Sequence, residues 1–204
     1  MTKVEDRSAL SPELGTTRVE AFSDSVMAVI ITIMAFELRP PAGAGLDAMR
    51  DQLPGLLAYI LSFVFVGIYW NNHHHLLRAA DRISGAAMWA NLFLLFWLSL
   101  IPVLTEWVRD EYRHTLPAAS YGAVALAAGL AYTVLVRALI HANGRDSRLA
   151  RAIGSDIKGY LSVVLYAAAV GLAFVNPWIA YGIFGGVALM WFVPDRRFTC
   201  RQNR

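Results

Sequence analysis

Charged residues are scarce in this chain of 204 residues. Asp, Glu, Lys and Arg make up 16% of the sequence and hydrophobic residues 57%, whereas about a quarter of an ordinary soluble domain is charged. Four intervals contain no charged residue: 52–77, 83–105, 114–136 and 159–194. One globular domain of this size cannot cover so many apolar segments with its own polar surface. The composition therefore indicates an integral membrane protein.

Cysteine and the usual catalytic motifs are also nearly absent. The single cysteine, Cys200, excludes an intramolecular disulfide framework. The sequence lacks a nucleophile and base pair, a glycine-rich phosphate loop and paired metal ligands, and its short loops leave no room for an extramembrane catalytic domain. The net charge of +3 is scattered over helix ends. We therefore expect no enzyme, no cofactor, no metal and no nucleic-acid partner, and we place the function in the membrane helices.

The apolar segments predict six membrane-spanning helices, because about 20 residues of helix cross the hydrocarbon core. The longest uncharged interval is divided at "VNPW" (175–178), where Pro177 cannot continue a helical hydrogen-bond ladder and Asn176 suits a turn. We expect a short helical hairpin there. The six predicted spans are 18–38, 54–77, 85–107, 117–140, 157–175 and 177–193.

Cationic residues near the helix ends predict the orientation. The two tails and the second and fourth loops hold 13 Lys and Arg residues, whereas the opposite loops hold four. The prediction is an all-α, six-helix membrane domain at 17–194, with a polar tail at 1–16 that we expect to be poorly ordered and a basic tail at 195–204. Both tails are expected to be cytoplasmic.

The first span, "RVEAFSDSVMAVIITIMAFEL" (18–38), is the most polar of the six. At about 100° per residue, one group of side chains falls in a single stripe along the helix. The members of this stripe are Ser25, Val29, Thr32, Ile33 and Phe36. Ser23 and Asp24 lie more than about 100° from Val29 around the axis, which suggests two different tasks for the two faces.

Two interpretations of the stripe remain open from the residues alone. An apolar stripe is normally a packing surface, but the low hydrophobicity of this span favours a helix partly exposed to water. In a pore, the Val29 side chain would gate by dewetting and the Thr32 hydroxyl would replace part of an ion's hydration shell. Ser23 and Asp24 would anchor the helix to its neighbours through hydrogen bonds.

A second polar cluster, "YWNNHHHLLR" (69–78), closes the second span. Three consecutive histidines diverge by about 100° each on a helix and cannot meet one ion, and the i, i+4 partner typical of helical metal sites is missing. We expect some of these rings, together with Asn91 of the third span, to reach Ser23 and Asp24. An alternative function is a small proton-coupled secondary transporter that uses Asp24 and the histidines, although inverted repeats are not evident.

The two clusters together resemble the transmembrane protein 175 family of potassium channels. The first helix carries the R-x-x-x-F-S-D motif of the family, and "YWNNHH" with Asn91 is similar to its second and third helices. The motif residues are Arg18, Phe22, Ser23 and Asp24. The likeness runs from Arg18 to about Pro102, with a compatible six-span layout beyond.

The resemblance implies a channel rather than an enzyme. Bacterial members look like homotetramers of six-helix subunits in the inner (plasma) membrane, with the first helices around a central pore and no re-entrant filter loop. This chain has one such unit and no "TVGYG"-like segment. A potassium-permeable cation channel with weak selectivity over sodium is implied.

The resemblance also implies roles for individual residues. Val29 corresponds to the hydrophobic constriction and Thr32 to the hydroxyl ring that sets selectivity. Phe36 should line the wider outer stretch, with Ser25 and Ile33 on the same pore face. The motif residues should bond to the second and third helices, here through Trp70, His73 and Asn91. Val29 is smaller than the Leu or Ile often found at the constriction, which implies a wider gate.

Overall fold

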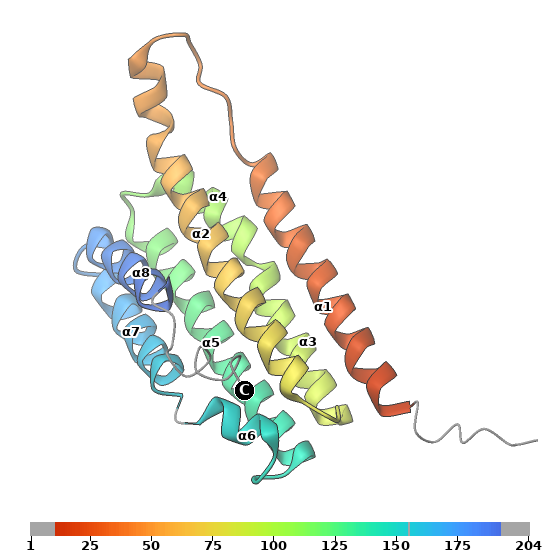
Figure 1. Cartoon of the computed structure of the whole chain (residues 1–204). Helices are drawn as coiled ribbons and strands as arrows, with labels where there is room; N and C mark the ends of the chain where they lie inside the picture. Colours follow the sequence, from red (N-terminus) through yellow and green to blue (C-terminus); the bar gives the residue numbers. More distant parts are fainter. Residues whose placement is uncertain (1–10, 155, 193–204) are drawn as a thin grey trace, which may run out of the picture.

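The structure, a computed structural model, describes residues 11–154 and 156–192, and all regular elements within them are α-helices (Figure 1). The helices are α1 (Ser11–Phe36), α2 (Leu46–Ala79), α3 (Gly85–Ser99), α4 (Ile101–Glu111), α5 (Thr115–Asn143), α6 (Arg148–Ile153), α7 (Ile157–Ala173) and α8 (Pro177–Phe192). The predicted all-α class is confirmed. The basic tail at 195–204, with Cys200, lies outside the described residues.

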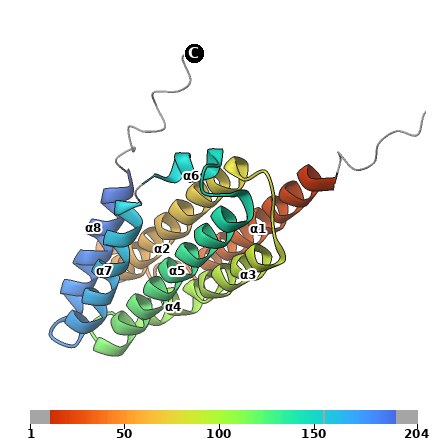
Figure 2. The ribbon, with the colours of Figure 1, turned by 90° about the horizontal axis from the view of Figure 1, so that it is seen from below.

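The helices form a bundle with α1 at one edge (Figures 1 and 2). Helix α1 packs on α2, α3 and α4, whereas α5 lies centrally and contacts α3, α4, α7 and α8. The helices α7 and α8 lie at the opposite edge from α1 (Figure 2). Among the described residues, one side of α1 is therefore left without a neighbour.

A cluster of aromatic rings joins the helices behind α1. Phe65 of α2, Tyr121 of α5, Tyr166 of α7 and Phe184 of α8 contact one another with ring centroids between 5.2 and 6.2 Å apart. All four side chains are buried. These four rings come from α2, α5, α7 and α8, whereas α1 adds Met27, Ile30 and Met34 to the same hydrophobic core.

The third predicted span is one apolar stretch, Gly85–Glu111, with an interruption at Leu100. Pro102 lies in the first turn of α4, where a missing N–H is tolerated. The Ser99 hydroxyl donates to the Phe96 carbonyl at 2.7 Å. The proline therefore separates α3 from α4 without ending the span.

The predicted hairpin at "VNPW" is present. Helix α7 ends at Ala173 and α8 begins at Pro177, and the Asn176 side-chain oxygen accepts a hydrogen bond from the Trp178 N–H at 2.9 Å. Within residues 11–154 and 156–192, four helical stretches are long and apolar enough to cross a membrane by length and composition, namely Gly15–Phe36, Leu46–Ala79, Gly85–Glu111 and Thr115–Asn143. The helices α7 and α8 are apolar but shorter.

Helix α1 begins at Ser11, inside the stretch expected to be a poorly ordered tail at 1–16. Pro12 follows in the first turn, where its fixed φ angle and its missing N–H suit a helix start. The expectation placed the helix start at residue 18 because hydrophobicity ends there. Helical hydrogen bonding does not require apolar side chains, so the helix continues beyond the apolar stretch.

Two further helical segments occupy predicted loops. Helix α2 starts at Leu46 instead of residue 54, with Asp47 in its first turn, where a carboxylate interacts favourably with the helix dipole. Helix α6 lies in the fourth loop, and the Ser147 hydroxyl caps it by accepting from the Ala150 N–H at 3.1 Å. A polar residue near the start of the helix, Asp47 in α2 and Ser147 in α6, marks each of these starts. Such residues do not affect a prediction made from the length of apolar segments.

Candidate functional site

Helix α1 buries one face against the rest of the subunit. Ser23, Met27, Ile30 and Met34 are each at most 3% exposed. Their spacing of four, three and four residues places them on one side of a helix. This face fixes the rotation of α1 about its own axis.

The predicted stripe lies on the opposite side of α1 and is exposed along its whole length. Phe36 is 86% exposed, Val29 53% and Ile33 44%, and Ser25 and Thr32 are exposed as well. Large apolar side chains with this exposure in a membrane protein meet lipid, another subunit or a pore. The structure of the subunit thus leaves the stripe available for assembly.

The two hydroxyl groups of the stripe have the same arrangement. The Ser25 Oγ donates to the Ala21 carbonyl at 2.8 Å, and the Thr32 Oγ1 donates to the Val29 carbonyl at 2.9 Å. Because each hydroxyl proton is used within α1, each oxygen keeps its acceptor lone pairs. The stripe therefore offers acceptors, which are suited to a cation, at two levels.

A buried chain of hydrogen bonds connects α1 to α3 and α2. The Ser23 hydroxyl donates to the Val19 carbonyl at 2.8 Å and accepts from the Asn91 side-chain N–H at 2.9 Å. The Asn91 oxygen lies 2.7 Å from the His73 Nε2, so this nitrogen is the donor. All three side chains are buried. These hydrogen bonds bring together three of the residues that were expected to interact.

A second contact ties Asp24 to α2. The Trp70 indole N–H donates to an Asp24 carboxylate oxygen at 3.1 Å. Arg18 and Phe22 of the same sequence motif are exposed, and within the described part of the chain Arg18 forms no hydrogen bond or ion pair. The motif therefore divides into two residues that hold α1 in place and two that remain at its surface.

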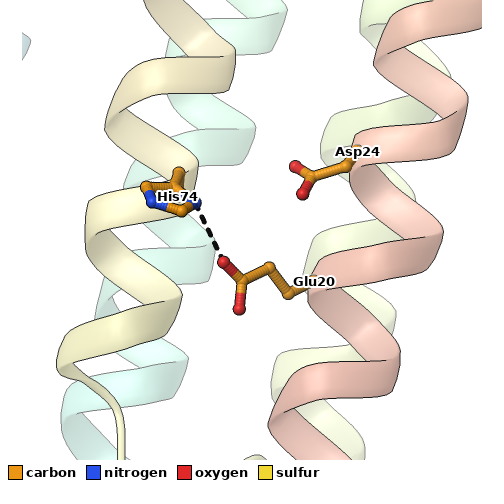
Figure 3. Close-up of side chains that lie close together, drawn as sticks. All are labelled: Glu20, Asp24 and His74. Atoms are coloured by element: carbon orange, nitrogen blue, oxygen red, sulfur yellow. Dashed lines mark ion pairs between the residues drawn. The ribbon is translucent and has the colours of Figure 1, made fainter.

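Glu20 of α1, which was not among the predicted site residues, lies beside Asp24 and reaches His74 of α2 (Figure 3). Its carboxylate lies 2.9 Å from the His74 Nδ1 and 3.9 Å from the Arg78 Nε. Glu20 and Asp24 are four residues apart on α1, as are Trp70 and His74 on α2. These matching i, i+4 spacings are the signal that could have paired the two helix faces.

Arg109 at the other end of α1 was also missed as an interacting residue. Its side chain is 9% exposed and pairs with Asp110 at 2.9 Å and Glu106 at 3.4 Å. It also donates to the Glu37 carbonyl just beyond the end of α1. A Cβ added to Gly55 of α2 would lie 2.7 Å from the Arg109 Cγ, so the arginine stem crosses α2 at this glycine. Arg109 thus joins α1, α2 and α4.

Comparison with known proteins decides the family. The family model described as "Endosomal/lysosomal potassium channel TMEM175" matches residues 18–102. A protein named a potassium channel in Chryseobacterium sp. (strain P1-3) is 46% identical over 180 residues, which cover 88% of this chain and 94% of the relative. The chain belongs to the TMEM175 family.

Other TMEM175 proteins are less similar to this chain in sequence. A solved structure described as a lysosomal potassium-selective channel TMEM175 homolog from Chamaesiphon minutus matches with a TM-score of 0.78 and 26% identity, covering 88% of this chain and 97% of that one. The endosomal/lysosomal proton channel TMEM175 of Gallus gallus is 29% identical over 149 residues, but only 30% of its length is matched.

The residues that the TMEM175 family model matches include most of the contacts described above. Residues 18–102 contain the exposed stripe of α1, the hydrogen-bonded chain through Asn91, and both Trp70 and His74. Because the family consists of ion channels, the chain is not an enzyme. The matched region ends at Pro102, so Arg109 lies outside it.

Proposed function

We propose that four copies of this chain form a potassium-permeable channel with weak selectivity among monovalent cations. The observation that carries the proposal is the exposed stripe of α1, which no other part of the described chain covers and which presents hydroxyl acceptors between apolar side chains. A single α1 cannot enclose a path, so the channel requires several copies of the chain, and the family resemblance implies a homotetramer. The names of the bacterial relatives support potassium as the permeant ion, and no cofactor is needed.

The residues of the stripe have different roles in the proposed pore. Val29 forms the hydrophobic constriction, where a narrow apolar ring expels water when closed. Thr32 lies one turn further along, and its hydroxyl oxygen partly replaces the water around a dehydrated ion. Phe36 lines the wider outer stretch, and Ser25 and Ile33 complete the pore face.

The opposite side of α1 fixes the rotation of the helix, so that the stripe faces the pore. Ser23 is held by Asn91 and, through it, by His73, while Asp24 is held by Trp70. Hydrogen bonds between membrane helices fix their relative rotation. Rotation of α1 about its axis would break these bonds and turn Val29 and Thr32 away from the channel axis.

The proposed topology has six spans with both termini in the cytoplasm of a bacterium, in the inner membrane. The helices α7 and α8 have 17 and 16 residues, or about 25 Å of helix at 1.5 Å per residue. That length crosses a bilayer with slight local thinning. The excess of Lys and Arg at one side supports the orientation.

The test is current through purified protein in planar bilayers. Stepwise potassium currents are expected, V29A should raise the open fraction by widening the constriction, and T32A should move the reversal potential toward equal permeability of potassium and sodium. In the proposed tetramer, T32A removes four hydroxyl ligands at once, each worth about 1 kcal/mol. The ratio of potassium to sodium permeability should therefore fall to about one. Permeation unaltered by both substitutions would remove the pore assignment.

A second candidate is a proton-coupled transporter, because Glu20, Asp24 and His74 converge at one end of α1 and α2. In that case, purified protein in liposomes would show saturable uptake driven by a pH gradient, without single-channel steps. The same bilayer experiment therefore separates the two candidates.

A further inference from the structure

Three side chains with metal-ligating atoms meet between α1 and α2. Glu20 and Asp24 extend from α1 toward His74 of α2 (Figure 3), and one ligating atom from each lies within 4.8 Å of the others. From the sequence we expect no metal here, because adjacent histidines diverge on a helix. His74 here has its ligand partners on another helix, about fifty residues away in the sequence.

The His74 Nδ1 is an unsatisfied atom in this cluster. It is buried and lies 2.9 Å from a Glu20 oxygen, yet it makes no hydrogen bond of acceptable geometry with the described residues. A buried polar nitrogen without a partner costs free energy. A cation bound between the nitrogen and the carboxylates would satisfy it.

Trp70 orients two of the three groups. Its indole N–H holds one Asp24 oxygen at 3.1 Å and leaves the second oxygen available. Its ring also stacks on the His74 imidazole, with centroids 5.9 Å apart and an angle of 25°. Groups that orient ligands in this way are typical of metal sites, and their loss weakens metal affinity.

We propose that Glu20, Asp24 and His74 bind one divalent transition-metal ion per subunit, with Zn²⁺ as the preferred ion, and thereby join α1 to α2. One imidazole and two carboxylates form a ligand set that zinc accepts, with water in the fourth position. Tetrahedral zinc places its ligand atoms about 3.4 Å apart. Small rotations of the half-buried carboxylates bring the present groups to that spacing. Magnesium and calcium, which take oxygen ligands, should bind poorly.

Arg78 competes with the metal. Its Nε lies 3.9 Å from a Glu20 oxygen, and its side chain is mostly exposed. The guanidinium therefore supplies positive charge when the metal is absent and can turn to solvent when the metal binds. R78Q should tighten zinc binding, because the carboxylates lose their competing cation.

The test uses the full-length protein with no affinity tag, stripped of metal with a chelator. Isothermal titration with ZnCl₂ should give saturable binding of one ion per subunit, and Zn²⁺ should raise the thermal unfolding midpoint whereas Mg²⁺ should not. H74Q and the E20Q/D24N double variant should lose saturable binding. W70F keeps the ligands and should weaken affinity about 10- to 100-fold.

A histidine substitution away from the cluster serves as the matched control. H114Q changes an exposed His–Glu pair of 3.3 Å at the other end of the bundle, whereas His75 is unsuitable because its ring contacts the His74 ring, with centroids 5.6 Å apart. The H114Q variant should bind zinc as the wild type does. Absence of saturable binding in the wild-type protein, retained binding in H74Q, or loss in the control variant overturns the proposal. The wild-type result decides the matter even if a variant does not fold.

The effect on conduction rests on the proposed channel function and is measured separately. Zinc on the side that faces Glu20 should reduce the open fraction in the wild type but not in H74Q, because a metal joining α1 to α2 opposes movement of the pore helix. Zinc binding without any potassium current would retain the metal site and refute the channel. Potassium current without zinc binding would retain the channel and refute the site.

Discussion

Buried polar side chains are costly in a membrane protein unless each finds a partner. Ser23, His73 and Asn91 are all buried, and the Asn91 amide contacts both of the others. One amide therefore satisfies groups on two neighbouring helices. The position of α1 depends on this residue more than on any exposed residue of the motif.

Replacement of Asn91 by alanine should destabilise the subunit by about 1–2 kcal/mol, because single hydrogen bonds between membrane helices contribute roughly 0.6 kcal/mol on average, up to about 1.7. N91A removes two and leaves the His73 N–H without an acceptor. Reversible unfolding in mixed detergent micelles measures the loss. N72A is the control. Among the described residues the Asn72 side chain bonds only to the Ile68 carbonyl of its own helix, so N72A should change stability by less than about 0.5 kcal/mol. Equal effects of the two substitutions would contradict the role of Asn91.

The contacts of individual residues were partly predictable. The helical period separates Val29 from Ser23 around α1, and the spans place Ser23, His73 and Asn91 at one depth, so their meeting was expected. The same argument did not find the contact between Glu20 and His74. Hydrophobicity and motif position identify which helix face is buried, but pairing of two charged side chains depends on the rotation of both helices.

At the scale of elements, the sequence predicted the apolar part of every long helix and most of the ends to within two residues, but it missed the starts of α1 and α2 by seven and eight residues. Uncharged intervals mark the hydrocarbon core because charge is expelled from it. Outside the core a helix continues for local reasons, as α1 does from Ser11 and α2 from Leu46. The short helix α6 lies outside the uncharged intervals, so those intervals could not predict it.

The crossing of Arg109 over Gly55 gives an element-scale prediction. G55A should destabilise the protein by about 1–3 kcal/mol, the usual cost of overpacking, because the new methyl group meets the Arg109 stem. In an R109A background the same substitution should stabilise by about 0.5–1 kcal/mol, since alanine is the better helix former. Thermal or denaturant unfolding of the two single variants and the double variant provides the cycle.

A matched control for this cycle is G67A. Gly67 lies in the same helix, and a Cβ there meets nothing within 4 Å, so G67A should be neutral or stabilising with either residue at position 109. Additive effects of G55A and R109A would show that the arginine stem does not lie over this glycine in solution.

At the scale of the whole molecule, the bundle is asymmetric. The helices α5, α7 and α8 share an aromatic core with α2, whereas α1 lies at one edge (Figure 2) and its stripe is exposed. The number of subunits around that stripe cannot be derived from one chain, because hydrophobic periodicity describes contacts within a subunit. The proposed tetramer comes from the family likeness and needs its own test.

Disulfide cross-linking tests whether the stripe faces a shared axis. In a C200S background, V29C should form dimers between subunits on mild oxidation, because side chains at a constriction approach one another closely enough for a disulfide, which requires Cα atoms about 4.4–6.8 Å apart. L189C is the control: Leu189 is 68% exposed on α8, at the edge opposite α1, and should remain monomeric on a denaturing gel. If L189C cross-linked and V29C did not, the subunit interface would lie at α8 and not at α1, and α1 would not line the pore.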